Sequence, residues 1–181
     1  MDQATRRRFQ VAAHRSAVLI RARSNVGHIE FATGDVRGRI EVDLDAEGAI
    51  VGSGPYATVE ILMDTLESGN ALYDAELRRK IEARRFPRAT VQLLSVEPIA
   101  GTDRYQLRGE LNMHGVTRTI TGTVTVAVSQ AQTIVVTGEH VFDIRDFDLP
   151  PPTTTMLKIY PDVRVQMHLE AHTEALPPGA L

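Results

Sequence analysis

Apolar and polar residues alternate along most of this chain, most clearly in the segment 105–128. In the first half of this segment the apolar or small residues share one parity: Leu107, Gly109, Leu111 and Met113. After a His114-Gly115 turn the alternation resumes, with Ile120, Gly122, Val124 and Val126 on one face and threonines on the other. Because successive side chains of a strand point to opposite faces, this pattern predicts two paired strands with one wet and one dry face.

The same period of two recurs in eight segments: 16–24, 36–44, 59–63, 89–96, 105–113, 117–128, 133–144 and 162–171. Residues 71–82 differ, since they are rich in helix formers, and Pro87 ends that region. Helices do not alternate with the strands, which argues against a parallel sheet. The pattern predicts a mainly β chain, an antiparallel barrel or sandwich with one short helical insertion. Eight strands are enough to close a barrel.

Length and composition indicate one globular domain, residues 1–181, with a core at about 10–172 and flexible termini. The net charge of −3 argues against nucleic acid as a partner. The chain has no cysteine, which excludes disulfides and thiolate metal sites. No apolar run has the ~18 residues of a membrane span, and the N-terminus does not resemble a signal peptide. We therefore expect a cytoplasmic protein.

The dry face of the predicted sheet carries glycines at four positions: Gly38, Gly109, Gly122 and Gly138. A packed barrel needs bulk at its centre, and this chain has no Trp and few other aromatic residues. We therefore predict a hollow barrel, although barrel glycines can also relieve strand coiling at bends or bulges. The predicted apolar lining consists of Val18, Ile20, Val36, Gly38, Ile40, Leu107, Gly109, Leu111, Ile120, Gly122, Val124, Val136, Gly138, Phe142, Val165 and Met167.

Two polar residues are candidates for contact with a ligand inside this lining. His140 falls in the inward register, where it could bond to a carbonyl or a phosphate, and Arg145 follows on the same segment. A plainer interpretation makes His140 a barrel-end histidine that bonds to backbone or water. A basic cluster near the predicted helix could touch an anionic head group or a membrane surface: Arg78, Arg79, Lys80, Arg84, Arg85 and Arg88. The alternative is a solvated helix face near the barrel mouth, paired with Glu76 and Glu82.

Patterns of catalytic and metal-binding residues give no candidates in this sequence. There is no nucleophile elbow of the form Gly-x-Ser-x-Gly and no obvious pair of carboxylates for acid–base chemistry. His168 and His172 are four residues apart, but on a strand and its exit rather than on a helix, and no His-Glu-x-x-His pattern occurs. We expect no catalytic residue, no metal and no cofactor.

The hairpin at residues 109–120 resembles the signature of the YceI-like family of polyisoprenoid-binding proteins, in which a strand ends in a His- or Asn-Gly-Val-Thr-Lys/Arg turn. Other segments resemble family motifs in the expected order: 14–18, 34–38, 85–91, 145–147 and 163–171. Asp148 departs from the glycine that the family commonly has. The resemblance covers about residues 10–172 and implies an extended, lipocalin-like antiparallel barrel that binds a long isoprenoid chain, often a quinone or a polyprenyl phosphate.

Together these observations favour a non-enzymatic protein that carries or stores an isoprenoid lipid or quinone. Two alternatives stay open: an enzyme that holds an apolar isoprenoid-like substrate in the same barrel, with His140 or Arg145 as its polar group, and a filled barrel that serves as an interaction module. The expected partners are the lipid and, transiently, a membrane surface, with no nucleic acid. Association of two chains into a homodimer is also left open.

Overall fold

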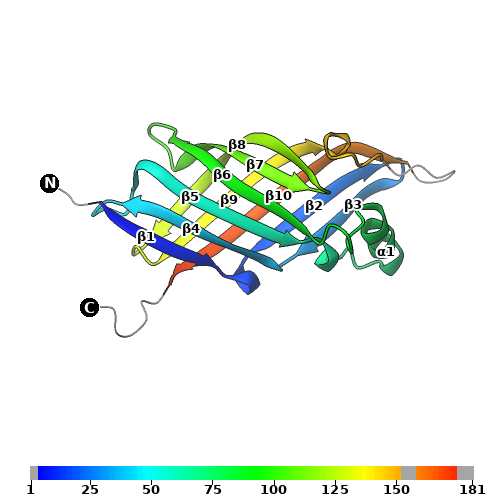
Figure 1. Cartoon of the computed structure of the whole chain (residues 1–181), viewed down its shortest axis with the longest axis horizontal. Helices are drawn as coiled ribbons and strands as arrows, with labels where there is room; N and C mark the ends of the chain where they lie inside the picture. Colours follow the sequence, from blue (N-terminus) through cyan, green and yellow to red (C-terminus); the bar gives the residue numbers. More distant parts are fainter. Residues whose placement is uncertain (1–3, 152–157, 175–181) are drawn as a thin grey trace.

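A long antiparallel sheet rolls into a closed barrel in the computed structural model, which describes residues 4–151 and 158–174 (Figure 1). Eight strands form the ring, and β1 pairs with β10 to close it. In ring order they are β1 (Thr5–Val11), β4 (Val36–Leu44), β5 (Ile50–Leu62), β6 (Arg88–Pro98), β7 (Arg104–Met113), β8 (Val116–Ser129), β9 (Thr133–Asp143) and β10 (Ile159–Thr173). The predicted eight-stranded antiparallel barrel is confirmed.

Two more strands form a hairpin at one edge of this ring: β2 (Ala17–Ser24) and β3 (Gly27–Thr33). The long strand β10 makes this possible, because its first part pairs with β2 and its last residues pair with β1. The short helix η1 (Ala13–Arg15) separates β1 from β2. The barrel begins at Thr5, ahead of the predicted start near residue 10. The predicted flexible ends at 1–3 and 175–181 lie outside the described residues.

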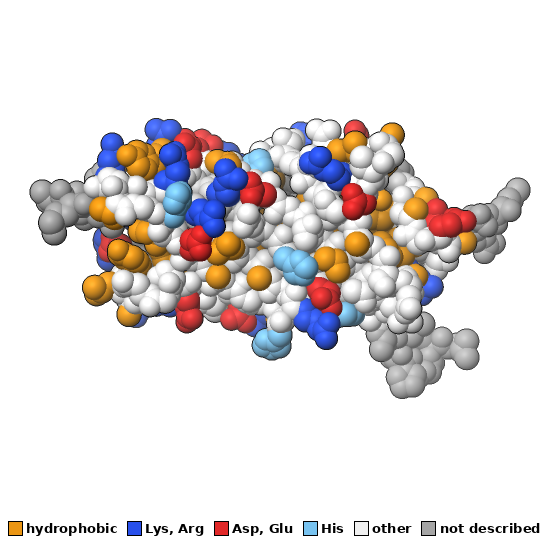
Figure 2. All heavy atoms as spheres, turned by 180° about the vertical axis from the view of Figure 1, so that it is seen from behind, with side chains coloured by type: hydrophobic (Ala, Val, Ile, Leu, Met, Phe, Trp, Pro, Cys, Tyr) orange, Lys and Arg blue, Asp and Glu red, His pale blue; other side chains and the backbone are white. Residues whose placement is uncertain are grey.

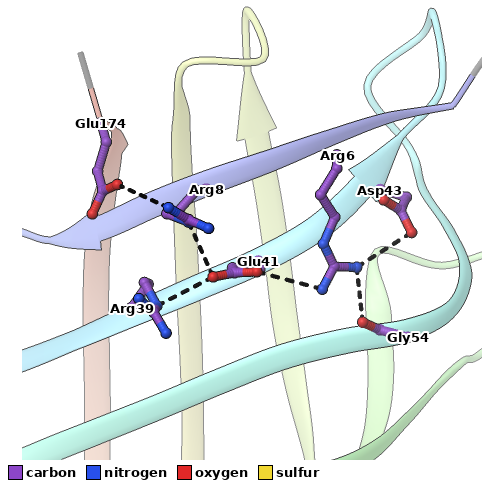
Figure 3. A network of polar contacts seen from close by, with 7 residues as sticks. All are labelled: Arg6, Arg8, Arg39, Glu41, Asp43, Gly54 and Glu174. Atoms are coloured by element: carbon purple, nitrogen blue, oxygen red, sulfur yellow. Dashed lines mark hydrogen bonds and ion pairs between the residues drawn. The ribbon is translucent and has the colours of Figure 1, made fainter. Parts of the chain in front are cut away.

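Ion pairs cover the outer face of the seam where β1 meets β4 (Figure 3). Glu41 lies 3.0 Å from Arg8, 3.2 Å from Arg39 and 3.7 Å from Arg6. Ion pairs at a protein surface contribute about 0–1 kcal/mol each. Burial on the inner face contributes more, because a fully buried apolar side chain is worth about 1.5–3 kcal/mol and Phe9 is 0% exposed. Apolar packing therefore holds the seam closed.

Helix α1 (Ala71–Lys80) lies at one end of the barrel (Figure 1). Its N-cap is Asn70, whose Oδ1 accepts hydrogen bonds from the backbone N–H groups of Leu72 and Tyr73 at 3.0 and 3.3 Å. Asp74 anchors the first turn, since its Oδ1 accepts from both the backbone N–H and the hydroxyl of Ser68. The predicted helical insertion is confirmed. In the part of the chain that the structure describes, no helix has the length and apolar character needed to cross a membrane.

Two apolar clusters pack the two ends of the barrel. One surrounds Phe9 at the β1–β10 seam, and the other includes Phe31, Leu66, Ile81 and Phe147 beneath α1. Three partly buried residues pack against both clusters: Ile20, Ile61 and Val91. The outer surface is mixed, and Figure 2 shows acidic and basic side chains close together with hydrophobic ones between them. Buried residues of both clusters also face the interior of the barrel between them.

Candidate ligand-binding site

An apolar cavity of about 440 Å³ lies inside the barrel. Every strand except β1 contributes to its wall, and most of the lining residues are aliphatic. Many of them, including Val136 and Val165, are only half-buried although they point inward, because the space they face is empty. A wall of this kind favours a long flexible hydrocarbon over a polar metabolite.

Fourteen of the sixteen predicted lining residues lie in the wall of this cavity. They come from six strands: Val18, Ile20, Ile40, Leu107, Gly109, Leu111, Ile120, Gly122, Val124, Val136, Gly138, Phe142, Val165 and Met167. The polar candidate His140 lies there as well. Their contact with a ligand stays a prediction.

The other three predicted site residues lie outside the wall. Val36 is 0% exposed and packs into the cluster at the β1 end. At Gly38 the backbone approaches β5 so closely that an added Cβ would lie 2.4 Å from the carbonyl oxygen of Thr58. Arg145 turns away and pairs with the carboxylate of Asp143, with Nε at 2.9 Å and Nη2 at 2.5 Å. The placement of these three residues at the cavity was therefore wrong.

Glycine occurs at the four inward positions for different structural reasons. An added Cβ at Gly109 would lie 2.9 Å from the carbonyl oxygen of Gln92, and one at Gly138 would lie 2.9 Å from Cγ1 of Val124. With Gly38, these positions allow neighbouring strands to approach each other, which neither the hollow interior nor the relief of strand coiling had predicted. Gly122 alone of the four leaves open space, since its nearest neighbour is Nδ1 of His140 at 3.6 Å. The cavity therefore does not come from a row of missing side chains.

His140 is the histidine that reaches the cavity, and its ring centroid lies 4.5 Å from that of Phe142, with the two rings tilted by 58°. Burial lowers the pKa of His140 below its ordinary value, because the charged form loses hydration. The ring is therefore neutral at neutral pH and presents one donor and one acceptor. Among residues 4–151 and 158–174, none forms a hydrogen bond with this ring. The cavity thus contains a polar group that is free to bond to a ligand.

Helix α1 and the segment before it close one end of the cavity, and sequence reasoning did not foresee this. Tyr73, Leu77 and Ile81 line the wall, as do Met63 and Leu66. One sequence feature could have indicated this: Leu77 and Ile81 are four residues apart and therefore lie on the same face of a helix. Glu76 and Lys80 lie at the same end, so the rim there is charged.

The His114-Gly115 turn that marks the predicted family motif is structural in this chain. Both residues have positive φ, 53° and 75°. The ring of His114 lies with Nδ1 3.1 Å from the carbonyl oxygen of Phe147 and Nε2 2.9 Å from a carboxylate oxygen of Glu82. The turn therefore ties the β7–β8 hairpin to the chain that follows α1 and to the short helix η3 (Ile144–Phe147). The turn residues do not line the cavity.

A family of known proteins matches most of this chain. The family model described as the YceI-like domain matches residues 9–171. The chain belongs to the YceI-like family. The resemblance of its hairpin and flanking motifs is thereby confirmed. No curated protein matches this YceI-like chain.

Solved structures share the fold of this YceI-like chain at low sequence identity. BcnA from Burkholderia cenocepacia is 23% identical with a TM-score of 0.73, over 88% of this chain and 98% of that one. A polyisoprenoid binding domain from Saccharophagus degradans is 16% identical with a TM-score of 0.70, over 92% and 98%. A YceI protein from Campylobacter jejuni is 18% identical with a TM-score of 0.59, over 77% and 82%. The structural similarity shows that these proteins share the barrel fold, and identities this low support no further conclusion.

Proposed function

We propose that this chain binds a long isoprenoid lipid, an isoprenoid quinone or a polyprenyl phosphate, and carries or stores it unchanged without a further cofactor. The observation that carries the proposal is the apolar cavity of about 440 Å³ with the imidazole of His140, which has no hydrogen-bond partner among the described residues. Burying several hundred Å² of apolar lipid surface contributes on the order of 10 kcal/mol before ordering and association costs. The Saccharophagus degradans neighbour, named as a polyisoprenoid binding domain, supports the choice of ligand class.

The residues around the cavity favour binding over catalysis. The His140 ring has no carboxylate partner within the described chain to orient it as a general base. The same part of the chain holds no group of three or more His, Asp or Glu side chains arranged for a metal ion. A cavity of this size also argues against the filled barrel as an interaction module.

Adding an isoprenoid quinone or polyprenyl phosphate to the purified protein tests this proposal. At about 100 times the Kd, a ligand stabilises the native state by about 2.7 kcal/mol. For a domain of this size, that raises Tm by roughly 5–10 °C. Mass spectrometry of the recovered lipid then separates the two binding hypotheses. An unchanged lipid supports a carrier, a chemically altered lipid favours an enzyme, and the absence of any Tm shift with either lipid contradicts both.

We propose that the exposed surface of helix α1 contacts a membrane while lipid is exchanged. Leu72 is 80% exposed on the first turn, at the end of the barrel where the cavity meets the helix. Residues 71–88 contain six Arg and Lys and three Asp and Glu, a net charge of +3 in a chain whose total is −3. An exposed leucine beside an excess of basic residues suits an anionic bilayer surface.

Flotation with vesicles that contain phosphatidylglycerol measures this contact. Leu72→Asp is expected to reduce vesicle binding about tenfold, because it removes an apolar anchor and adds a negative charge. Leu94→Asp is the matched control, since Leu94 is exposed on β6, away from the helix. Equal binding of the two variants would contradict a role for α1.

A further inference from the structure

Strands β8 and β9 separate along part of their length and leave a fork in the barrel wall. β8 bonds to β7 from its first residue, and β9 bonds to β10 up to its last residue. The two strands nevertheless pair with each other only from Val124–Gly138 to Ser129–Thr133. Residues 116–123 and 139–143 therefore have no strand partner across the fork in the part of the chain that the structure describes. The fork opens toward the α1 end, where the β7–β8 turn contacts Glu82.

The apolar cavity reaches the outer surface through this fork. Its wall includes Thr121, Thr123 and Glu139, although their positions along the strands point outward. A second pocket lies outside the barrel at the base of the fork and shares four residues with the cavity: Thr123, Gly138, Glu139 and Met167. Because Gly138 has no side chain, the space inside and the groove outside are separated only by backbone at this point. The cavity and the outer pocket therefore adjoin each other at the base of the fork.

The outer pocket, called here the fork groove, is polar. It is bordered by Arg104, Thr123, Thr125, Thr137, Gly138, Glu139, Gln166 and Met167. In the described chain, neither the Arg104 guanidinium nor the three threonine hydroxyls has a hydrogen-bond or ion-pair partner. The carboxylate of Glu139 is already occupied by Arg164 and by Gln166, the latter at 2.8 Å. As far as the described residues go, one cation and three hydroxyls of the groove are free and available to an anion.

The chemistry of the fork groove selects a phosphate among the ligands considered above. A quinone ring carries no charge and gains little from an arginine in water. A phosphate monoester offers three oxygens to the guanidinium and to hydroxyl donors, and arginine matches that geometry with two parallel bonds. The hydrogen bond from Gln166 and the charge of Arg164 lower the pKa of Glu139, so this carboxylate is ionised, and its ion pair with Arg164 offsets the negative charge.

We propose that the ligand is an isoprenyl phosphate whose tail fills the cavity, whose first isoprene unit passes the fork beside His140, and whose phosphate binds Arg104 and the threonine hydroxyls of the fork groove. This inference rests on the proposed function and adds the head-group class and its place. The neutral His140 ring lies on the inner side of the fork, near Gly122, where it can donate to the ester oxygen. The head group thus stays in water while the tail is buried.

Binding of geranylgeranyl phosphate and of geranylgeraniol, which share one tail, tests this inference. The wild-type protein is expected to bind the phosphate at least about tenfold more tightly, as charge-assisted hydrogen bonds imply. Arg104→Ala should abolish this preference, because it weakens the binding of geranylgeranyl phosphate and leaves the binding of geranylgeraniol unchanged. Unchanged alcohol binding also shows that the variant is folded. Arg37→Ala is the matched control, an exposed arginine on β4 in the opposite wall.

Each other outcome overturns a definite part of the account. If both lipids bind equally to the wild-type protein, or if Arg104→Ala keeps the preference, the fork groove is not the head-group site although the proposed function stands. If neither lipid binds, the proposed function fails with it. Inorganic phosphate in large excess should not displace geranylgeranyl phosphate, because the tail supplies most of the affinity. Displacement at comparable concentrations would make the groove a site for free phosphate and would contradict the proposal.

Discussion

Gly122→Phe is expected to leave the barrel folded and to abolish lipid binding. An added Cβ at position 122 meets only Nδ1 of His140, at the ordinary contact distance of 3.6 Å, and the residue lines the cavity. A phenylalanine side chain covers roughly 150 Å² of apolar surface that the lipid would otherwise contact. At about 25 cal/mol per Å², that costs the lipid about 4 kcal/mol. The affinity should therefore fall by several hundredfold, to the order of 10⁻³ of its wild-type value.

Titration of wild-type and variant proteins with the same isoprenoid, together with thermal melts, measures this effect. Gly122→Ala is the matched control, since a methyl group fits the open space and should change neither affinity nor Tm appreciably. A Gly122→Phe protein that melts well below the wild type would indicate a packed interior, because overpacking a filled core is destabilising. A folded variant that still binds lipid with wild-type affinity would show that the lipid lies elsewhere.

Gly38→Ala is expected to destabilise the fold without changing the lipid affinity of the folded protein. An added Cβ would lie 2.4 Å from the carbonyl oxygen of Thr58 and 3.1 Å from Cα of Val59. Both neighbours are backbone atoms of a paired strand, so neither can turn aside as a side chain would. Strain of this kind typically costs about 1–3 kcal/mol. For a domain of this size, Tm should fall by roughly 2–12 °C.

Calorimetric melting of Gly38→Ala beside Gly122→Ala checks the assignment, because the two substitutions add the same methyl group to inward positions of the same barrel. The structure predicts a large loss at position 38 and little change at position 122. Equal melting temperatures would mean that β4 and β5 do not approach as closely as described. A Gly38→Ala protein that folds but loses lipid affinity would place this residue back at the cavity wall.

The alternation of residues predicted the barrel well, because each strand has one apolar and one polar face and the period of two identifies the inner one. This explains why Leu107, Ile120 and Val165, which the alternation places inward, lie in the cavity wall. Strand β1 was missed because its sequence does not show this alternation. Three consecutive arginines, Arg6 to Arg8, conceal the alternation, and only Phe9 and Val11 of this strand are buried.

The sequence did not indicate the features that depend on how closely neighbouring strands approach each other. An inward glycine can mark a cavity, as at Gly122, or a close contact, as at Gly109, and only the distance to the next strand separates the two cases. Arg145 illustrates a second limit, since a salt bridge to Asp143 two residues away turns its side chain outward. The fork between β8 and β9 has no signal in the alternation, because unpaired and paired strands show the same period.

Extraction of the protein from the cells that make it tests the central claim most directly. The purified protein is treated with organic solvent, and mass spectrometry identifies and counts the released lipids, with Gly122→Phe processed in parallel. The account predicts close to one isoprenoid lipid per chain for the wild-type protein and a much smaller amount for the variant. A wild-type protein that releases no isoprenoid, and that takes none up when isoprenoid quinone or polyprenyl phosphate is added, would contradict it.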